Sequence, residues 1–246
     1  PTRRSSDLIA INTSSISSDK NIAKATTLQA KTPIPTSKSS VKNTSSVLSL
    51  SNIKKSASNT TNPIVPFSAD IVIYNSHPNE AYPSGIKVTA VGSLISDKLV
   101  KEGFNSHFVK VNPPINYNNS YSATRDMITK NVKKYSNTIL LDIHRDSTVD
   151  NKSDTQKILF AVTESNPRYK ANKRFVDSLI VNIKDSKIIE PEILFYQYGM
   201  SFYNQDLSNN SALIEIGNTM SSDSDIEACV NALVSALKNT QKVPSN

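Results

Sequence analysis

The segment Thr138-Ile-Leu-Leu-Asp-Ile-His-Arg-Asp146 decides how the rest of this chain is organised. It begins as an apolar run, which is typical of a β-strand buried on both faces. It then stops on three polar residues, His144, Arg145 and Asp146. In open α/β sheets, ligands bind just beyond the carboxyl ends of the strands. We therefore predict a central strand at residues 138–143 with a functional site at its end.

Two other segments have the same design. Ala69-Asp-Ile-Val-Ile-Tyr-Asn-Ser-His77 is an apolar run that ends on a histidine, and Glu80 follows it. Ala212-Leu-Ile-Glu215 is a shorter run that ends on a carboxylate. Because the carboxyl ends of parallel strands lie at one edge of a sheet, we expect these polar residues to converge.

Strand patterns alternate with helix patterns from residue 70 to residue 238, which predicts an α/β fold. We expect three layers, with a mainly parallel sheet and helices on both of its faces. The expected strands are residues 70–75, 105–111, 138–143, 157–163, part of 191–199, and 211–216. The expected helices are residues 86–102, 122–135, 166–183 and 223–238, and residues 203–207 are expected to form a polar loop.

The first 66 residues have a different composition. They are rich in Ser, Thr, Lys and Asn, and no aromatic residue precedes Phe67. They hold nine basic and two acidic side chains, so the whole net charge of +7 lies there. Such a segment buries too little apolar surface to offset its ordering entropy. We predict a disordered basic linker at residues 1–66 and a catalytic domain at residues 67–246.

Composition also excludes several classes of protein. Residues 67–246 have 19 basic and 19 acidic side chains, which disfavours a nucleic-acid-binding domain. The single cysteine, Cys229, excludes an internal disulfide and lies in a helical apolar pattern typical of a core. The sequence has no apolar run of about 18 residues, the minimum for a membrane helix. We expect a membrane anchor to precede the sequence given.

The three polar segments predict a zinc site. A catalytic Zn²⁺ is held by about three His, Glu or Asp ligands and keeps one position open. His77 and Glu80 have His-x-x-Glu spacing, and His144 comes from another strand, so these three are the predicted ligands. Asp142 lies two residues before His144, on the same side of a strand, and is expected to orient its imidazole.

Glu215 is the predicted general base and acid, which would take a proton from water and deliver it to the leaving nitrogen. Arg125 and Arg145 are candidates for binding substrate carboxylates. Taken singly, each of these residues also has an ordinary structural explanation. The histidines are often hydrogen-bonded structural residues, Glu80 could be a solvated loop acid, and Glu215 could pair with an arginine. For His107 and for Tyr82, Tyr121 and Tyr203, structural roles are favoured.

These motifs resemble the stage II sporulation protein P family of peptidoglycan hydrolases over roughly residues 70–237. The resemblance implies the fold of zinc N-acetylmuramoyl-L-alanine amidases (amidase type 3). Five motifs and Val91-Gly92 carry it in the family's order: Ile73-Tyr-Asn-Ser-His-Pro-Asn-Glu-Ala-Tyr82, Ser120-Tyr-Ser-Ala-Thr-Arg125, Asp142-Ile-His-Arg-Asp146, Tyr203-Asn-Gln-Asp-Leu207 and Leu213-Ile-Glu-Ile-Gly217.

The family resemblance implies an activity and a setting. The activity is hydrolysis of the N-acetylmuramoyl-L-alanine amide bond of peptidoglycan, with cleavage of peptide cross-links as an additional activity. The implied partners are stage II sporulation proteins D and M, which act together with the family during spore engulfment. The expected location is extracytoplasmic, with a membrane anchor at the sporulation septum.

The sequence departs from the family pattern in two places. The family's first motif usually reads His-Thr-His, whereas here it is Asn75-Ser-His77, and the segment after Glu215 is shortened to Gly217-Asn-Thr. These departures keep two alternatives open. One is a zinc endopeptidase that cleaves cross-links, and the other is a non-catalytic module that binds the wall or a partner.

Overall fold

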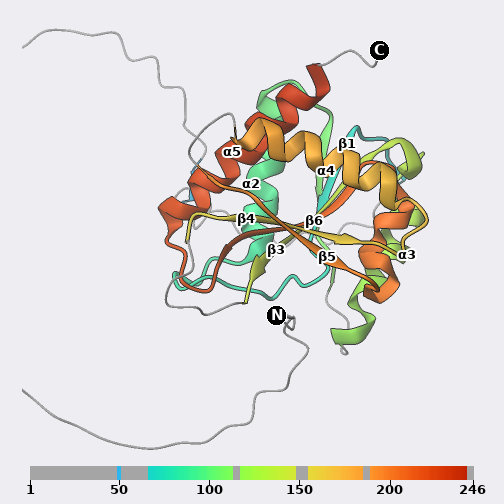
Figure 1. Cartoon of the computed structure of the whole chain (residues 1–246), viewed down its shortest axis with the longest axis horizontal. Helices are drawn as coiled ribbons and strands as arrows, with labels where there is room; N and C mark the ends of the chain where they lie inside the picture. The colour runs from blue at the N-terminus through green and yellow to red at the C-terminus, as the bar shows by residue number, and fades with distance from the viewer. Residues whose placement is uncertain (1–48, 51–65, 113–116, 148–154, 185–188, 243–246) are drawn as a thin grey trace, which may run out of the picture. The chain divides into compact units, whose positions relative to one another are not determined.

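The computed structural model in Figure 1 describes residues 49–50, 66–112, 117–147, 155–184 and 189–242. Almost all of the predicted linker, residues 1–66, lies outside the described residues, so its disorder stays a prediction. Within the described part, no helix combines the length and the apolar character needed to cross a membrane.

A single mixed sheet forms the centre of the described part (Figure 1). Its six strands are ordered β2-β1-β3-β6-β4-β5. All neighbouring pairs are parallel except β4 and β6, which are antiparallel. The predicted mainly parallel α/β sheet is therefore confirmed. The strands are β1 (Ile71–Tyr74), β2 (Ser106–Val109), β3 (Ile139–Asp146), β4 (Ile158–Thr163), β5 (Glu192–Tyr196) and β6 (Ser211–Asn218).

Helices cover both faces of this sheet, which confirms the three layers. On one face, α2, α4 and α5 pack through a large apolar cluster that includes Leu141, Ile143 and Ile214. On the other face, α3 packs through a smaller cluster around Val72 and Leu140. The helices are α2 (Val88–Lys101), α3 (Ser120–Asn131), α4 (Tyr169–Lys184) and α5 (Asp223–Lys242), and Cys229 of α5 is buried as predicted.

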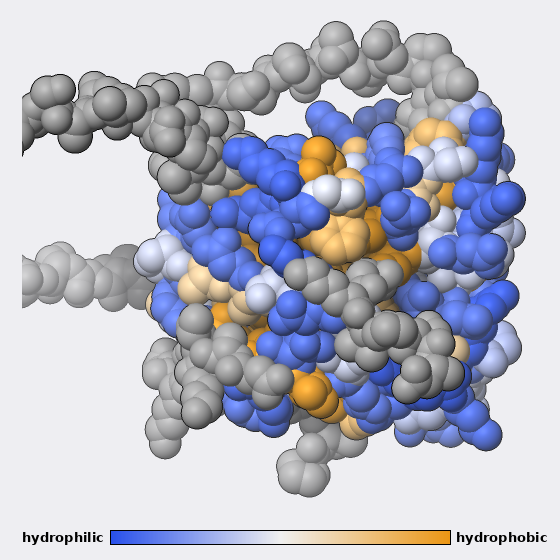
Figure 2. All heavy atoms as spheres, turned by 90° about the horizontal axis from the view of Figure 1, so that it is seen from above, coloured by the Kyte–Doolittle hydropathy of each residue, from blue (hydrophilic) through white to orange (hydrophobic). Residues whose placement is uncertain are grey.

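The helices form where the apolar residues recur at helical spacing. In α2, the buried residues include Val88, Val91, Ile95 and Leu99, and Gly103 follows the helix with φ of +91°, a conformation that glycine adopts without steric cost. Burying these faces leaves a mostly hydrophilic surface. On the face shown in Figure 2, apolar residues appear only in groups between hydrophilic ones.

Two strands, β3 and β6, end later than the sequence predicted. His144, Arg145 and Asp146 lie inside β3 rather than beyond it, and β6 ends at Asn218 rather than at residue 216, with Glu215 inside the strand as predicted. The reason is that the backbone pairing of β3 with β6 continues past the apolar run, as His144 pairs with Glu215 and Asp146 with Asn218. Successive side chains point to opposite faces, so polar side chains can occupy one face while Ile143 packs on the other.

The prediction of a loop at residues 203–207 was also wrong, because these residues belong to a 3₁₀ segment, η3 (Met200–Leu207). Within it, residues 201–204 form a left-handed turn, with φ values of 50°, 51°, 51° and 58°. None of these residues is glycine, and each such conformation costs roughly 1–2 kcal/mol. A turn of this kind persists only where surrounding contacts hold it.

Leu50 lies within the predicted linker, yet its side chain is only 1% exposed and belongs to the large apolar cluster on the α2, α4 and α5 face. Burying a leucine side chain contributes on the order of 2 kcal/mol. The folded unit therefore draws at least one core residue from before residue 66.

We predict that Leu50→Ala lowers the free energy of unfolding by about 2–4 kcal/mol, because it removes a buried side chain from a packed core. Urea denaturation of the full chain measures this change. Val100→Ala is the control, since Val100 is 53% exposed and its truncation should change stability by only about 0.5 kcal/mol. Equal effects of the two substitutions would show that Leu50 is not part of the core.

Candidate metal and catalytic site

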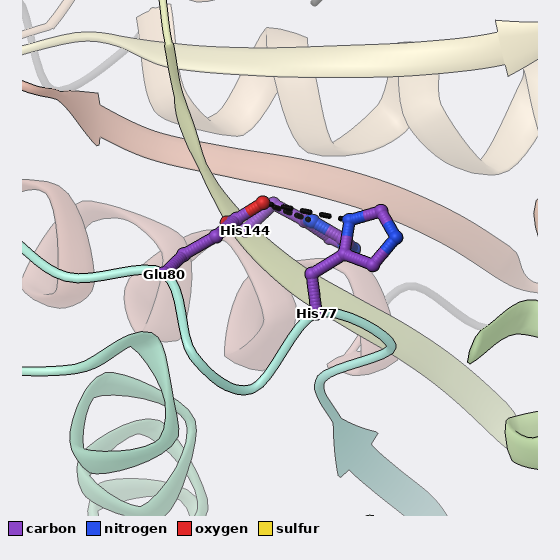
Figure 3. Close-up of side chains that lie close together, drawn as sticks. All are labelled: His77, Glu80 and His144. Atoms are coloured by element: carbon purple, nitrogen blue, oxygen red, sulfur yellow. Dashed lines mark hydrogen bonds and ion pairs between the residues drawn. The ribbon is translucent and has the colours of Figure 1, made fainter. Parts of the chain in front are cut away.

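The turn that follows β1 carries His77 and Glu80 to the edge of β3. The backbone N–H of Glu80 donates to the His77 carbonyl at 3.3 Å, which closes the turn. Figure 3 shows the Glu80 carboxylate joined by dashed lines to both imidazoles. Its Oε1 atom lies 3.5 Å from Nδ1 of His77 and 3.3 Å from Nδ1 of His144. One ligand atom from each residue lies within 4.8 Å of the others, so the three residues can share one ion.

Hydrogen bonds fix the orientation of His144. Its Nε2 atom lies 3.0 Å from Asp142 Oδ1 and 2.9 Å from Ser76 Oγ. Asp142 also accepts hydrogen bonds from the Ser76 backbone N–H at 2.8 Å and from the Ser76 hydroxyl at 2.7 Å. Nε2 is the nitrogen that would keep its proton, on Asp142 and Ser76, when a metal binds, and Nδ1, which faces Glu80, is the nitrogen that would ligate the ion.

The two carboxylates beside His144 favour positive charge. Burial lowers the pKa of His144, but Asp142 and Glu80 outweigh burial and raise the pKa well above its usual range. The pKa of Glu80 moves the other way. Burial raises it, while the His144 charge and hydrogen bonds from His77 and the Arg145 backbone hold it well below its usual range. An ionised carboxylate and a cation-favouring pocket suit a divalent metal.

His77 gives a second sign that a cation fits. Its side chain is 8% exposed, and its Nε2 atom is buried with no hydrogen-bond partner in the described part of the chain. Its Nδ1 atom lies 2.8 Å from the Tyr117 hydroxyl, and the two rings stack with centroids 3.9 Å apart. Two imidazoles and one carboxylate are a donor set that Zn²⁺ accepts.

Glu215 lies beside His144, because the two residues are paired across β3 and β6. Burial raises the pKa of Glu215, the charge of Asp146 raises it further, and His144 opposes them, with a net pKa of about 7. Asp146 in turn forms a buried ion pair with Lys157, at the start of β4. A carboxyl group with a pKa near neutrality can both accept and donate a proton at physiological pH.

The two arginines that were predicted to bind substrate carboxylates are engaged within the protein. Arg125 forms a two-pronged ion pair with Asp206, with distances of 2.8 and 2.6 Å. The Nε of Arg145 donates to the Ala81 carbonyl at 2.7 Å, and its backbone N–H donates to Glu80 at 3.0 Å. Arg145 therefore holds the Glu80 turn in place, and Arg125 anchors η3 to α3.

Sequence reasoning missed two contacts of the site, Ser76 and Tyr117. Ser76 is adjacent to His77 in the chain, so its proximity gave a weak signal. Tyr117 gave no signal in the sequence, because it lies 40 residues after His77 and only the fold brings the two together. His107 is an exposed residue of β2 and lies outside the site, bonded to Asn105, as the sequence favoured.

Comparisons with known proteins identify a family. The family model described as Stage II sporulation protein P (SpoIIP) matches residues 4–238. No curated protein matched the sequence. Similar solved structures include the CwlD amidase of Clostridioides difficile in complex with the GerS lipoprotein, with 12% identity, a TM-score of 0.47 and coverage of 70% of this chain and 98% of that one. Another is the catalytic domain of CwlV, an N-acetylmuramoyl-L-alanine amidase of Bacillus (Paenibacillus) polymyxa var. colistinus, with 9% identity, a TM-score of 0.46 and coverage of 71% and 99%. Similarity at this level says nothing about activity.

The raised pKa of Glu215 predicts how stability depends on pH in metal-free protein. The unfolded chain ionises this group near 4.5 and the folded protein near 7, so ionisation costs folding free energy as pH rises. We expect Glu215→Gln to remove this cost. Between pH 4 and pH 8.5, the stability of the variant relative to the unsubstituted protein should rise by on the order of 3 kcal/mol.

Denaturant titrations in the presence of a chelator measure this difference. Leu213→Ala is the control, because it lies on the same strand and removes no titratable group. A relative stability of the Glu215→Gln variant that stays constant with pH would contradict the assignment.

Proposed function

This chain belongs to the stage II sporulation protein P family, and from that premise we propose that it is a zinc-dependent peptidoglycan hydrolase that cleaves the N-acetylmuramoyl-L-alanine amide bond. The observation that carries the proposal is the convergence of His77, Glu80 and His144, with Glu215 beside them on the same sheet. Three nitrogen and oxygen donors with a nearby proton-transfer group form the arrangement that amide hydrolysis at a zinc site requires.

His77, Glu80 and His144 would hold the ion. When bound, a zinc ion supplies Lewis acidity to the scissile carbonyl and to an attacking water. Asp142 and Ser76 keep the His144 imidazole in the ligating tautomer through its Nε2 atom. The carboxylate of Glu215 accepts the proton of the attacking water and then donates it to the departing amide nitrogen.

Asn75, where the family usually has a histidine, does not take a member away from the candidate ligand group. Its side-chain amide donates to the carbonyls of Ile143 at 2.5 Å and Val88 at 3.3 Å, and so joins β1 to β3 and α2. Its Oδ1 atom lies beside Gly92 of α2. Asn75 therefore has a structural role on the helix side, and the replacement leaves the His77, Glu80 and His144 group complete.

We propose a setting as well. In it, the protein acts on septal peptidoglycan during sporulation, outside the cytoplasm. The proposed partners are stage II sporulation proteins D and M. Co-purification from sporulating cells tests the partnership, and recovery of this protein without either partner would contradict it.

We predict that the full chain releases stem peptides from purified sacculi in the presence of zinc and that a chelator stops the release. His144→Ala should abolish both zinc binding and release, because it removes a ligand. Glu215→Gln should retain zinc but slow release by about 10²–10⁴-fold, because it removes only the proton transfer. Zinc content and mass spectrometry of the products measure these effects.

The control is His107→Ala, which removes the exposed histidine of β2 and should change neither quantity. Products cut within the peptide cross-links, with intact muramoyl amides, would identify an endopeptidase instead. Binding to sacculi without release, unaffected by Glu215→Gln, would identify a non-catalytic module. Equal zinc contents in the unsubstituted protein and in the His144→Ala variant would refute the metal site.

A further inference from the structure

A row of aromatic rings leads away from His77. On one side, Tyr117 stacks on the imidazole. On the other side, the Tyr121 ring lies 5.1 Å from His77, Tyr203 lies 5.2 Å from Tyr121, and Tyr196 lies 5.7 Å from Tyr203, all between ring centroids. We call Tyr117, Tyr121, Tyr203 and Tyr196 the tyrosine row. It joins the candidate metal site to β5, at the end of the strand order.

The tyrosine row lies on the catalytic face of the sheet. Tyr121, Tyr196 and Tyr203 pack against Ala161 of β4 and Leu213 of β6. Leu213 is two residues before Glu215 in the same strand, so both side chains point to the same face. The row therefore crosses β6 and β4 on the side where Glu215 and His144 lie. Tyr117 is 54% exposed, Tyr196 and Tyr203 are partly buried, and Tyr121 is only 5% exposed, so Tyr117, Tyr196 and Tyr203 are the members of the row that a ligand can reach.

The left-handed turn at residues 201–204 sets the position of Tyr203 within the row. Asn204 donates to the Tyr121 carbonyl at 3.0 Å, which ties the turn to α3. Gln205 donates to the Ala161 carbonyl at 2.8 Å and accepts from the Thr163 N–H at 3.2 Å, which ties it to β4. Gly199 completes the fit, because a Cβ there would lie 2.7 Å from the Tyr203 ring. Two side chains of η3 thus bind backbone groups of α3 and β4 and hold an unfavourable backbone conformation, and strain of this kind concentrates at binding sites.

We propose that the tyrosine row is a binding subsite for the sugar rings of a glycan strand, beside the bond that is cleaved. This inference deepens the proposed function and rests on it. A sugar ring offers a flat face of C–H groups with hydroxyls at its edge. Tyrosine rings offer an apolar face, which complements the C–H face of a sugar ring.

The charges around the row favour sugar over stem peptide. Binding an acidic peptide calls for cations with donors directed at the ligand. Among the described residues, two cations that contact η3 are already engaged within the protein. Arg125 is paired with Asp206 through both of its terminal nitrogens, and Arg168 donates to the Asp206 carbonyl and to Asn209. The row itself consists of neutral tyrosines, which suits a neutral ligand.

The test measures binding of chitotetraose, a soluble tetramer of N-acetylglucosamine. This ligand carries no stem peptide, so it lacks the bond that the proposed reaction cleaves. Calorimetric titration of the full chain compares Tyr196→Ala, Tyr196→Phe and Tyr198→Ala. Tyr198→Ala is the matched control, because Tyr198 is 73% exposed, close in the chain, and outside the row. We expect Tyr196→Ala to weaken binding about threefold to tenfold, the effect of one lost ring contact. Tyr196→Phe and Tyr198→Ala should bind as the unsubstituted protein does.

The proposal would be overturned if the unsubstituted protein did not bind chitotetraose, or if Tyr196→Ala left the affinity unchanged. Loss of affinity for a soluble stem pentapeptide in Tyr196→Ala, with chitotetraose binding unchanged, would assign the row to peptide and also overturn it. The binding measurement needs no catalysis. A protein that binds chitotetraose through Tyr196 but releases no stem peptide from sacculi would refute the hydrolase and leave the glycan subsite standing.

Discussion

A buried carboxylate, that of Asp142, is the constraint on which the candidate site depends. Asp142 is fully buried in the middle of β3, where an unpaired charge would cost several kcal/mol. Ser76 meets this demand with its backbone N–H and its hydroxyl, and His144 meets it with Nε2. Satisfying one carboxylate thus fixes the chain where it leaves β1 and fixes the ring of His144, so the position of His77 follows.

The two faces of the sheet divide the work of the protein. The face under α2, α4 and α5 holds most of the apolar core and supplies rigidity. The other face is covered by α3 and η3, and its strands carry Asp142, His144 and Glu215 among smaller apolar clusters. Because successive strand residues alternate between faces, one strand can supply both the core and the chemistry. Functional groups set on strands packed in this way are held more precisely than groups on loops.

Much of this arrangement could be predicted from the sequence, because it follows from local patterns. Apolar periodicity identified the strands and helices, and the polar residues after each apolar run pointed to His77, His144 and Glu215. The predicted ends of β3 and β6 were wrong, because backbone pairing between strands that are distant in sequence decides where a strand stops. The partners of Arg125 and Tyr117 could not be predicted either. Arg125 contacts a residue 81 positions away and Tyr117 contacts one 40 positions away, and no local sequence pattern encodes such contacts.

The strand order has a consequence for synthesis. β6, the last strand in sequence among those described, lies between β3 and β4 near the middle of the sheet. A ribosome-bound chain that lacks β6 can pair β1 with β2 and β3, and β4 with β5, but these two halves have no strand to join them. Folding therefore waits for contacts between residues far apart in the chain, which slows it.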